Sequence, residues 1–154
     1  MSRSRAAIVA RWVGWALLAA GCAEPSEPDD DTPRHVVLIT LDTTRADHFG
    51  FMGNGEVATP ALDALAEESI VLADLTTAAP STLASHTTLF TGTYPNRHGV
   101  LRNGYTVNAE NEMLPELLAA RGFRTAGFVS AFVMSDRFDF AQGFAHYDQY
   151  FDQL

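Results

Sequence analysis

The sequence lacks the residues on which several classes of protein depend. It contains one cysteine, Cys22, and no lysine, so all ten basic residues are arginines. A single cysteine excludes a disulfide framework and a cysteine-based zinc site within this chain. A formal net charge of −9 excludes the basic surface with which proteins neutralise nucleic-acid phosphates. We therefore expect no nucleic acid among the partners of this chain.

The composition that remains is typical of a folded domain. Hydrophobic residues make up 47% of the 154 residues and aromatic residues 10%. This apolar content is too high for a disordered chain and is sufficient for a packed core. The length allows one domain and leaves no room for a second.

The N-terminus has the pattern of a secretory signal. Three arginines precede the uncharged run Trp12–Gly21, which is shorter than the roughly 20 residues that cross a bilayer. We predict a signal peptide at residues 1–21. The end of the run, Leu18–Cys22, resembles a bacterial lipobox, which implies that Cys22 is lipidated and that the protein is anchored outside the cytoplasm in a bacterial cell envelope. An ordinary cleaved signal and an uncleaved anchor are the alternatives.

Residues 22–34 form the next segment, which is acidic and rich in proline. It has no large apolar side chain to bury, so we predict a solvated linker. Three consecutive aspartates, Asp29–Asp31, are consistent with a metal or partner site, but such runs are more often simply solvated.

Residues 35–154 alternate between β-like and helical patterns. The continuous aliphatic run His35–Leu41 is typical of a strand that is buried on both faces of a parallel sheet. We predict strands at 35–41, 69–75 and 123–130, and helices from Thr59-Pro60, from Ser81 or Thr82 to Gly92, and from Leu114 to Arg121. This order predicts an α/β fold with a mainly parallel sheet flanked by helices.

Asp42 follows the first predicted strand and so lies at its carboxyl end. In parallel sheets, ligands bind at the carboxyl ends of the strands. Its carboxylate needs a cation or a capping role, because a charge beside a buried strand is costly when unpaired. It suits Ca²⁺, Mg²⁺ or Zn²⁺. The alternative is a turn residue that bonds its own backbone.

The segment Ser81–Gly92 combines hydroxyl residues with the start of a predicted helix. Backbone N–H groups at a helix N-terminus attract anions such as phosphate and sulfate. A hydroxyl close to a metal ion there can serve as a nucleophile. The alternative is plain capping, since serine and threonine are common N-caps.

Several short motifs, in the same order and spacing, resemble those of the sulfatase family, which belongs to the alkaline-phosphatase-like superfamily of metal-dependent hydrolases. The motifs are residues 42–50, 59–66, 81–92, 94–100, 114–118 with 121–126, and 142–147. The resemblance covers essentially all of residues 35–154 and implies the N-terminal part of an alkaline-phosphatase-like domain. Because the family's other metal ligands lie further along longer chains, we expect residues 35–154 to be a truncated domain.

Carried over by position, the resemblance implies a metal ligand at Asp42, a second at Thr43 and a nucleophile at Thr82. Thr43 stands where the family has a second aspartate. His86 stands where the family has an arginine, and it is either a catalytic-site residue that contacts the anion in place of that arginine or a histidine on the helix surface with no role. The family's nucleophile is a cysteine or serine oxidised to formylglycine. Threonine cannot form that aldehyde because its Cβ carries a methyl group, so we expect no formylglycine. Ser81 and Ser85 remain alternative nucleophiles, and the substrate-binding residues are unknown.

The resemblance implies a hydrolase of sulfate esters, acting on a small molecule or a glycan with a divalent metal ion. That ion is Ca²⁺ by analogy with sulfatases, or Zn²⁺ or Mn²⁺ by analogy with relatives that use a threonine nucleophile. Two alternatives remain open. One is a phosphodiesterase or phosphotransferase with Thr82 as nucleophile, and the other is a non-catalytic, lipid-anchored relic. The departures from the family pattern at Thr43, Ala84 and His86, and the absence of the lysine with which sulfatases contact sulfate, favour the non-catalytic alternative.

Overall fold

The computed structural model describes residues 34–151, which divide into two units, residues 34–40 and residues 41–151. The predicted signal peptide, Cys22 and all but the last residue of the predicted linker lie outside the described residues. Within the described part, no helix is both long enough and apolar enough to cross a membrane.

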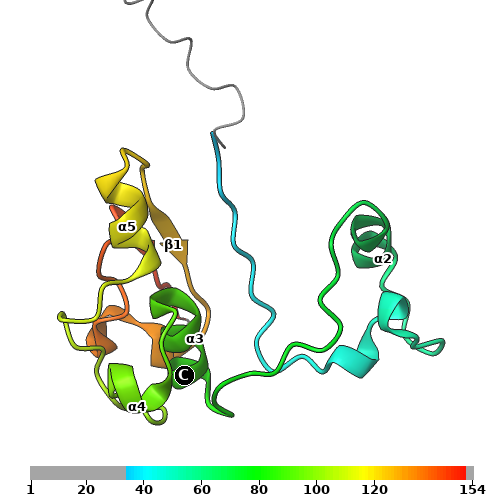
Figure 1. The fold of residues 1–154 in the computed structure, drawn as a ribbon, viewed down its shortest axis with the longest axis horizontal. Helices are drawn as coiled ribbons and strands as arrows, with labels where there is room; N and C mark the ends of the chain where they lie inside the picture. Colours follow the sequence, from blue (N-terminus) through cyan, green and yellow to red (C-terminus); the bar gives the residue numbers. More distant parts are fainter. Residues whose placement is uncertain (1–33, 152–154) are drawn as a thin grey trace, which may run out of the picture. The chain divides into compact units, whose positions relative to one another are not determined.

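The second unit contains short helices and one small sheet (Figure 1). In chain order the elements are η1 (Ala46–His48), η2 (Gly50–Met52), α2 (Pro60–Glu67), α3 (Thr82–Thr91), α4 (Pro95–His98), α5 (Leu114–Ala120), β1 (Ala126–Phe128), η3 (Phe132–Met134), η4 (Asp136–Phe138) and β2 (His146–Asp148). The helices predicted from Thr59-Pro60, Ser81 or Thr82, and Leu114 are confirmed as α2, α3 and α5. Gly122, at φ +86°, follows α5 as expected.

Parallel strand pairing is confirmed on a smaller scale than predicted. The sheet of the described residues has two strands, β1 and β2, with Ala126 opposite His146 and Phe128 opposite Asp148. Its first strand lies inside the predicted stretch 123–130. The second was not predicted, because its three residues, His146-Tyr147-Asp148, are too few to show an alternating pattern.

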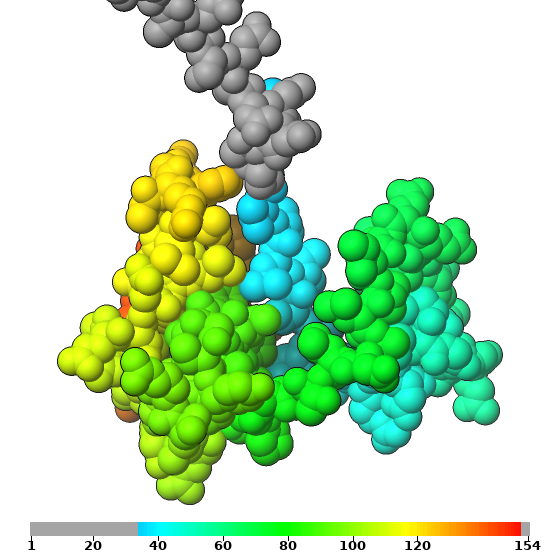
Figure 2. Space-filling view, in the orientation of Figure 1, coloured from blue at the N-terminus to red at the C-terminus, as the bar shows by residue number. Residues whose placement is uncertain are grey.

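The strands predicted at 35–41 and 69–75 are wrong for this structure, because neither segment is in a helix or strand. Their aliphatic side chains face solvent: Val37 is 80% exposed, Ile39 76% and Ile70 91%. Figure 2 colours these residues blue to green along the chain. A strand is defined by the neighbour that takes its backbone hydrogen bonds, and the sheet of the described residues includes neither segment.

The core surrounds α3, which lies against α4 and α5 (Figure 1) and also packs on η3. Its buried apolar side chains are Ala79, Leu83, Ala84, Val100, Val107, Met113, Met134 and Phe140. Six of the ten residues of α3 are polar, and one face of the helix is buried with hydroxyls that bond back to the helix's own carbonyls. Thr87 Oγ1 donates to Leu83 O and Thr91 Oγ1 to Thr87 O, each at 2.7 Å. Because these hydroxyls are paired, their burial in α3 does not carry the free-energy penalty of an unsatisfied polar group.

The contact between α3 and α4 includes a buried histidine, His98, which is 3% exposed. Its Nδ1 accepts the N–H of Val100 at 3.1 Å, so the ring proton is on Nε2, which donates to Thr88 Oγ1 at 3.0 Å. Burial lowers the pKa of His98 from its ordinary value of 6.5. The folded chain therefore holds this ring neutral.

We predict that acid weakens the fold through His98. The unfolded chain takes up the proton at higher pH than the folded chain, so the free energy of unfolding falls as pH drops below about 6.5, by at most about 1.4 kcal/mol per pH unit. Urea unfolding across this pH range measures the slope. His98→Asn keeps an acceptor for the Val100 N–H and removes the titrating group, so it flattens the profile. His35→Asn, at an exposed histidine, is the matched control and leaves the slope unchanged; equal slopes in H98N and wild type would contradict the prediction.

Candidate functional site

The candidate site is the N-terminal end of α3. Ser81 has an extended backbone (φ −109°, ψ 143°) and precedes Thr82, the first helical residue, while Gly92 ends the helix at φ +65°. Ser81 makes no side-chain capping hydrogen bond. The first-turn N–H groups of this ten-residue helix therefore need acceptors from elsewhere, and their partial positive charge favours anions.

Thr82 and Asp42, forty residues apart in the sequence, meet at this end of the helix. Thr82 Oγ1 donates to Asp42 Oδ2 at 3.1 Å and lies 3.4 Å from Asp42 Oδ1. Both side chains retain access to solvent. The structure thus brings together the hydroxyl and the carboxylate to which the sequence assigned nucleophile and metal ligand, although the two roles themselves stay predictions.

The structure distinguishes Thr82 from the two other hydroxyls considered as nucleophiles. Ser81 Oγ is buried and has no hydrogen-bond partner, so it is not presented to solvent. Ser85 Oγ donates to the Thr82 carbonyl at 3.0 Å. Thr82 alone of the three is paired with a carboxylate, which favours it as the reactive hydroxyl.

His86 lies one turn after Thr82 and is 7% exposed, so it is not the surface histidine that was one of its two interpretations. Its Nδ1 lies 2.8 Å from the Thr82 carbonyl oxygen. A carbonyl can only accept, so Nδ1 carries the ring proton and donates it. His86 thereby fixes the backbone of Thr82.

Asn103 is a site residue that the sequence analysis missed. Its Oδ1 accepts the N–H of Leu83 at 2.9 Å and so caps α3 from a loop twenty residues further along. Its Nδ2 has no hydrogen-bond partner among residues 34–151 and leaves two donors beside the start of the helix. The only signal in the sequence is the Asn103-Gly104 pair, which is typical of a turn but does not reveal which helix the turn reaches.

Asp42 and Thr82 are oxygen ligands of the kind that Ca²⁺ prefers, but they do not complete a metal site. Ca²⁺ takes about six to eight oxygens and Zn²⁺ about four ligands. No group of three or more His, Cys, Asp or Glu side chains within the described range is arranged to hold an ion. The site therefore fits two ligands of a metal centre, and further ligands are needed.

Thr43, the predicted second metal ligand, has a left-handed backbone with φ +56°. A β-branched residue is strained in this region, whereas aspartate and asparagine tolerate it better. The position is therefore suited to the aspartate that the sulfatase resemblance implies and is strained by the threonine that is present.

The loop after Thr43 is held by Asp47. Arg45 Nε donates to Asp47 Oδ1 at 2.9 Å, and His48 Nδ1 lies 3.0 Å from the same oxygen. The pKa of the Asp47 carboxyl is well below its usual range, mainly because of the Arg45 hydrogen bond and then the one from His48. Asp47 and His48 thus shape the loop.

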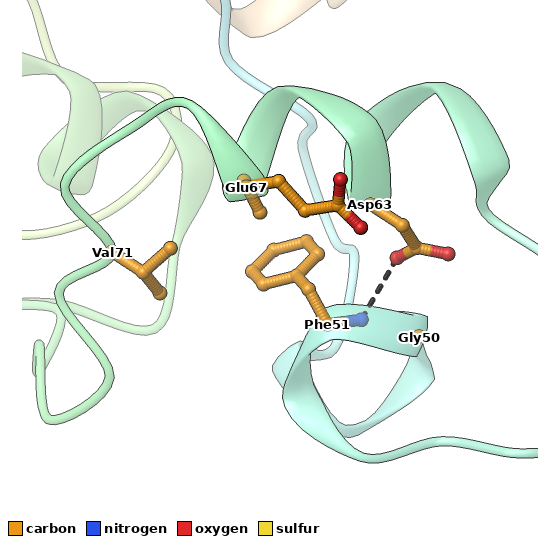
Figure 3. Close-up of a pocket in the computed structure, with 6 residues that line it drawn as sticks. Gly50, Phe51, Asp63, Glu67 and Val71 are labelled. Carbon is orange, nitrogen blue, oxygen red and sulfur yellow. Dashed lines mark hydrogen bonds between the residues drawn. The ribbon is translucent and has the colours of Figure 1, made fainter.

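An open groove lies apart from these residues, between η2 and α2. It is lined by Gly50, Phe51, Asp63, Ala66, Glu67 and Val71. Figure 3 shows the Phe51 ring between Glu67 and Val71, with the Phe51 N–H bonded to Asp63 Oδ1 at 2.8 Å. Thr59 Oγ1 also donates to Asp63 Oδ1 and accepts the Gly50 N–H. The polar contacts of this groove attach η2 to α2.

Comparison with known proteins gives one consistent result. A family model described as Sulfatase matches residues 34–153. The chain is 31% identical to an ulvan-active sulfatase of Formosa agariphila over 65% of this chain and 20% of the relative. It is 36% identical to an arylsulfatase of Clostridium perfringens (59% and 19%) and 33% identical to the steryl-sulfatase of Mus musculus (78% and 21%). The chain spans about a fifth of the length of these curated relatives. No solved structure matches it significantly.

We predict that two substitutions distinguish the effect of backbone strain at Thr43 on stability from the effect of the missing carboxylate on metal binding. Thr43→Asn relieves the left-handed backbone and raises the free energy of unfolding by about 1 kcal/mol. Thr43→Asp relieves the same strain but adds a second negative charge beside Asp42, so it gains stability mainly when Ca²⁺ is added. Urea unfolding of both variants with and without Ca²⁺ makes the measurement. An equal response of the two variants to Ca²⁺ would show that residue 43 does not face a metal ion.

Proposed function

Because the chain belongs to the sulfatase family, we propose that it carries the nucleophile of an enzyme that hydrolyses sulfate esters. The observation that supports this most directly is the hydrogen bond from Thr82 Oγ1 to Asp42 at the N-terminus of α3. It pairs a hydroxyl with an acceptor for its proton at a point where the helix attracts anions.

The sulfate group of the substrate binds at the end of α3 in this proposal. The helix dipole attracts its charge, and the two free N–H donors of Asn103 Nδ2 are available to its oxygens. His86 and Ser85 both bond to the Thr82 carbonyl, which holds the first turn in place. The hydroxyl of Thr82 is then presented to the sulfur by a rigid backbone.

The proposed reaction has two displacements. Thr82 Oγ forms a bond to sulfur while its proton passes to Asp42, and the bond from sulfur to the ester oxygen breaks, which releases the alcohol after it takes up a proton. Water then attacks the sulfated Thr82, the bond between sulfur and Thr82 Oγ breaks, and sulfate leaves. Asp42 gives the proton from Thr82 to the leaving alcohol and so returns to its carboxylate form, then accepts one proton from the attacking water and releases it to solvent.

Members of the sulfatase family generally use a divalent metal ion, and we include one in the proposal. Asp42 and Thr82 would hold it, with further ligands from outside the described residues; Ca²⁺ is the first candidate, and Zn²⁺ and Mn²⁺ are the alternatives. When bound, such an ion would supply positive charge that lowers the pKa of the Thr82 hydroxyl.

The identity of residue 82 favours a second candidate function. Threonine cannot become formylglycine, so Thr82 would attack directly, which is also the chemistry of phosphodiesterases and phosphotransferases with a threonine nucleophile. The site as described attracts either anion. A non-catalytic, lipid-anchored protein that binds such anions is the third candidate.

The location of the protein forms part of the proposal and rests on the sequence alone. The lipobox resemblance at Leu18–Cys22 supports a lipid anchor on Cys22, and hence a place in the bacterial cell envelope, outside the cytoplasm. Substrates would then be small-molecule or glycan esters that are encountered outside the cytoplasm.

We predict that Thr82→Ala lowers kcat at least about a thousandfold, because it removes the nucleophile, whereas Thr82→Ser retains most of the activity. The assay follows the release of sulfate and of phosphate from aryl monoesters and a phosphate diester by the full-length protein, before and after treatment with a chelator. Ser81→Ala is the matched control and should leave kcat within a few-fold, since its hydroxyl is buried.

The pattern of results separates the three candidates. Greater turnover of the sulfate ester supports the sulfatase, and greater turnover of the phosphate diester supports the second candidate. Full activity of Thr82→Ala, with loss of activity in Ser81→Ala, would move the nucleophile to Ser81. Absence of turnover of any ester by wild type and variants alike would leave the anion-binding protein as the remaining candidate.

A further inference from the structure

We propose that Asn103 is a site of spontaneous deamidation, and that its conversion to a carboxylate at the N-terminus of α3 weakens the binding of the ester over time. The chain contains two Asn-Gly pairs, Asn54-Gly55 and Asn103-Gly104. Glycine after asparagine lets the backbone nitrogen approach the side-chain amide, because no Cβ is in the way. The two pairs have the same local sequence chemistry, so a difference between them comes from the fold.

The Asn103 side chain is bonded in a way that favours the reaction. Its Oδ1 accepts the Leu83 N–H, which stabilises negative charge on that oxygen when the amide carbon is attacked. The nitrogen that must leave, Nδ2, has no hydrogen-bond partner among residues 34–151. Asn103 and Gly104 are both exposed and lie in a turn with open space around Gly104. One hydrogen bond therefore holds this amide, and the reaction can retain it.

The Asn54 side chain is bonded in a way that opposes the reaction. Its Oδ1 accepts the N–H groups of Glu56 and Val57, each at 2.8 Å, and its Nδ2 donates to the Asp47 carbonyl at 2.6 Å. The leaving nitrogen is thus held in place, and the side chain is fixed at both ends. Its three hydrogen bonds make the Asn54-Gly55 pair an internal control for Asn103-Gly104.

The chemistry needs only water. The Gly104 nitrogen forms a bond to Asn103 Cγ and loses its proton, while the bond from Cγ to Nδ2 breaks and ammonia leaves with that proton. Water then opens the resulting succinimide ring at one of its two carbonyls. One product is aspartate at position 103, and the other is isoaspartate, in which the chain runs through the former side chain. Each product carries one new negative charge.

The consequence for activity rests on the proposed function. A carboxylate at position 103 still accepts the Leu83 N–H and suits the helix dipole, so the fold is retained when aspartate forms. It replaces two N–H donors with negative charge, however, at the point where the anionic ester binds. Conversion to aspartate therefore raises KM for the ester without lowering stability.

The test compares the two asparagines in the same protein. The full chain is incubated at mildly alkaline pH, cleaved after glutamate, and analysed by mass spectrometry for the exchange of the side-chain amide for a carboxylate at each position. We expect Asn103 to convert about tenfold faster than Asn54 or more, a ratio that corresponds to about 1.4 kcal/mol. Cleavage at arginine is avoided because it would leave Asn103 as a new N-terminus. In urea, where the hydrogen bonds are lost, the two rates should become similar.

Equal rates in the folded protein, or faster conversion of Asn54, would overturn the proposal. A second measurement uses Asn103→Asp in the full-length enzyme, with Asn54→Asp as the control. The first variant should unfold at the same urea concentration as wild type or higher and show a KM raised about tenfold, and the second should leave KM unchanged. If Asn103 deamidates selectively but Asn103→Asp leaves KM unchanged, the modification stands and its effect on activity is refuted. If no ester is turned over by wild type, the proposed function fails separately.

Discussion

The geometry of the site depends on how the N-terminus of α3 is satisfied. A helix start leaves N–H groups without partners, and the N-cap residue, Ser81, does not serve them with its side chain. The Leu83 N–H is taken by Asn103, while the Thr82 carbonyl receives both Ser85 and His86. Both an N–H and a carbonyl of the first turn are therefore hydrogen-bonded to side chains. The Thr82 hydroxyl takes no part in these bonds and donates to Asp42. A conventional serine cap would satisfy the helix but would not bring Asn103 to its start.

The sequence predicted well those features that are local in the chain. For α3, the hydroxyl residues at its start and Gly92 at its end place the helix to within a residue or two of its observed ends. For α5, Pro115 in the first turn and Gly122 after the last turn do the same. The family resemblance named Asp42 and Thr82 as site residues, but the hydrogen bond between them was not predicted and is found in the structure. The capping of α3 by Asn103 was not predicted, because a single polar side chain in a turn gives no periodic pattern that identifies the helix it caps.

Strand predictions failed for a different physical reason. The aliphatic run His35–Leu41 indicates that the segment is suited to a buried strand. A strand also needs neighbouring strands that take its backbone hydrogen bonds and elements that cover its faces. Within the described part of the chain, the sheet consists of β1 and β2 alone. The burial of His86 and His98 could not be predicted from the sequence either. The sequence pattern around a histidine on a short helix is the same whether the side chain faces the core or water.

The exposed run His35–Leu41 has a consequence for the colloidal behaviour of the chain. It is a seven-residue segment of high β-propensity, with no proline, no glycine and no acidic or lysine side chain, which is the composition of segments that stack into intermolecular β-structure. Repulsion between chains that each carry a formal net charge of −9 opposes such stacking. Salt screens this repulsion over about 10 Å at 0.1 M and leaves the apolar attraction intact. The solubility of this chain is thus set by ionic strength, through a balance between one apolar segment and an acidic surface.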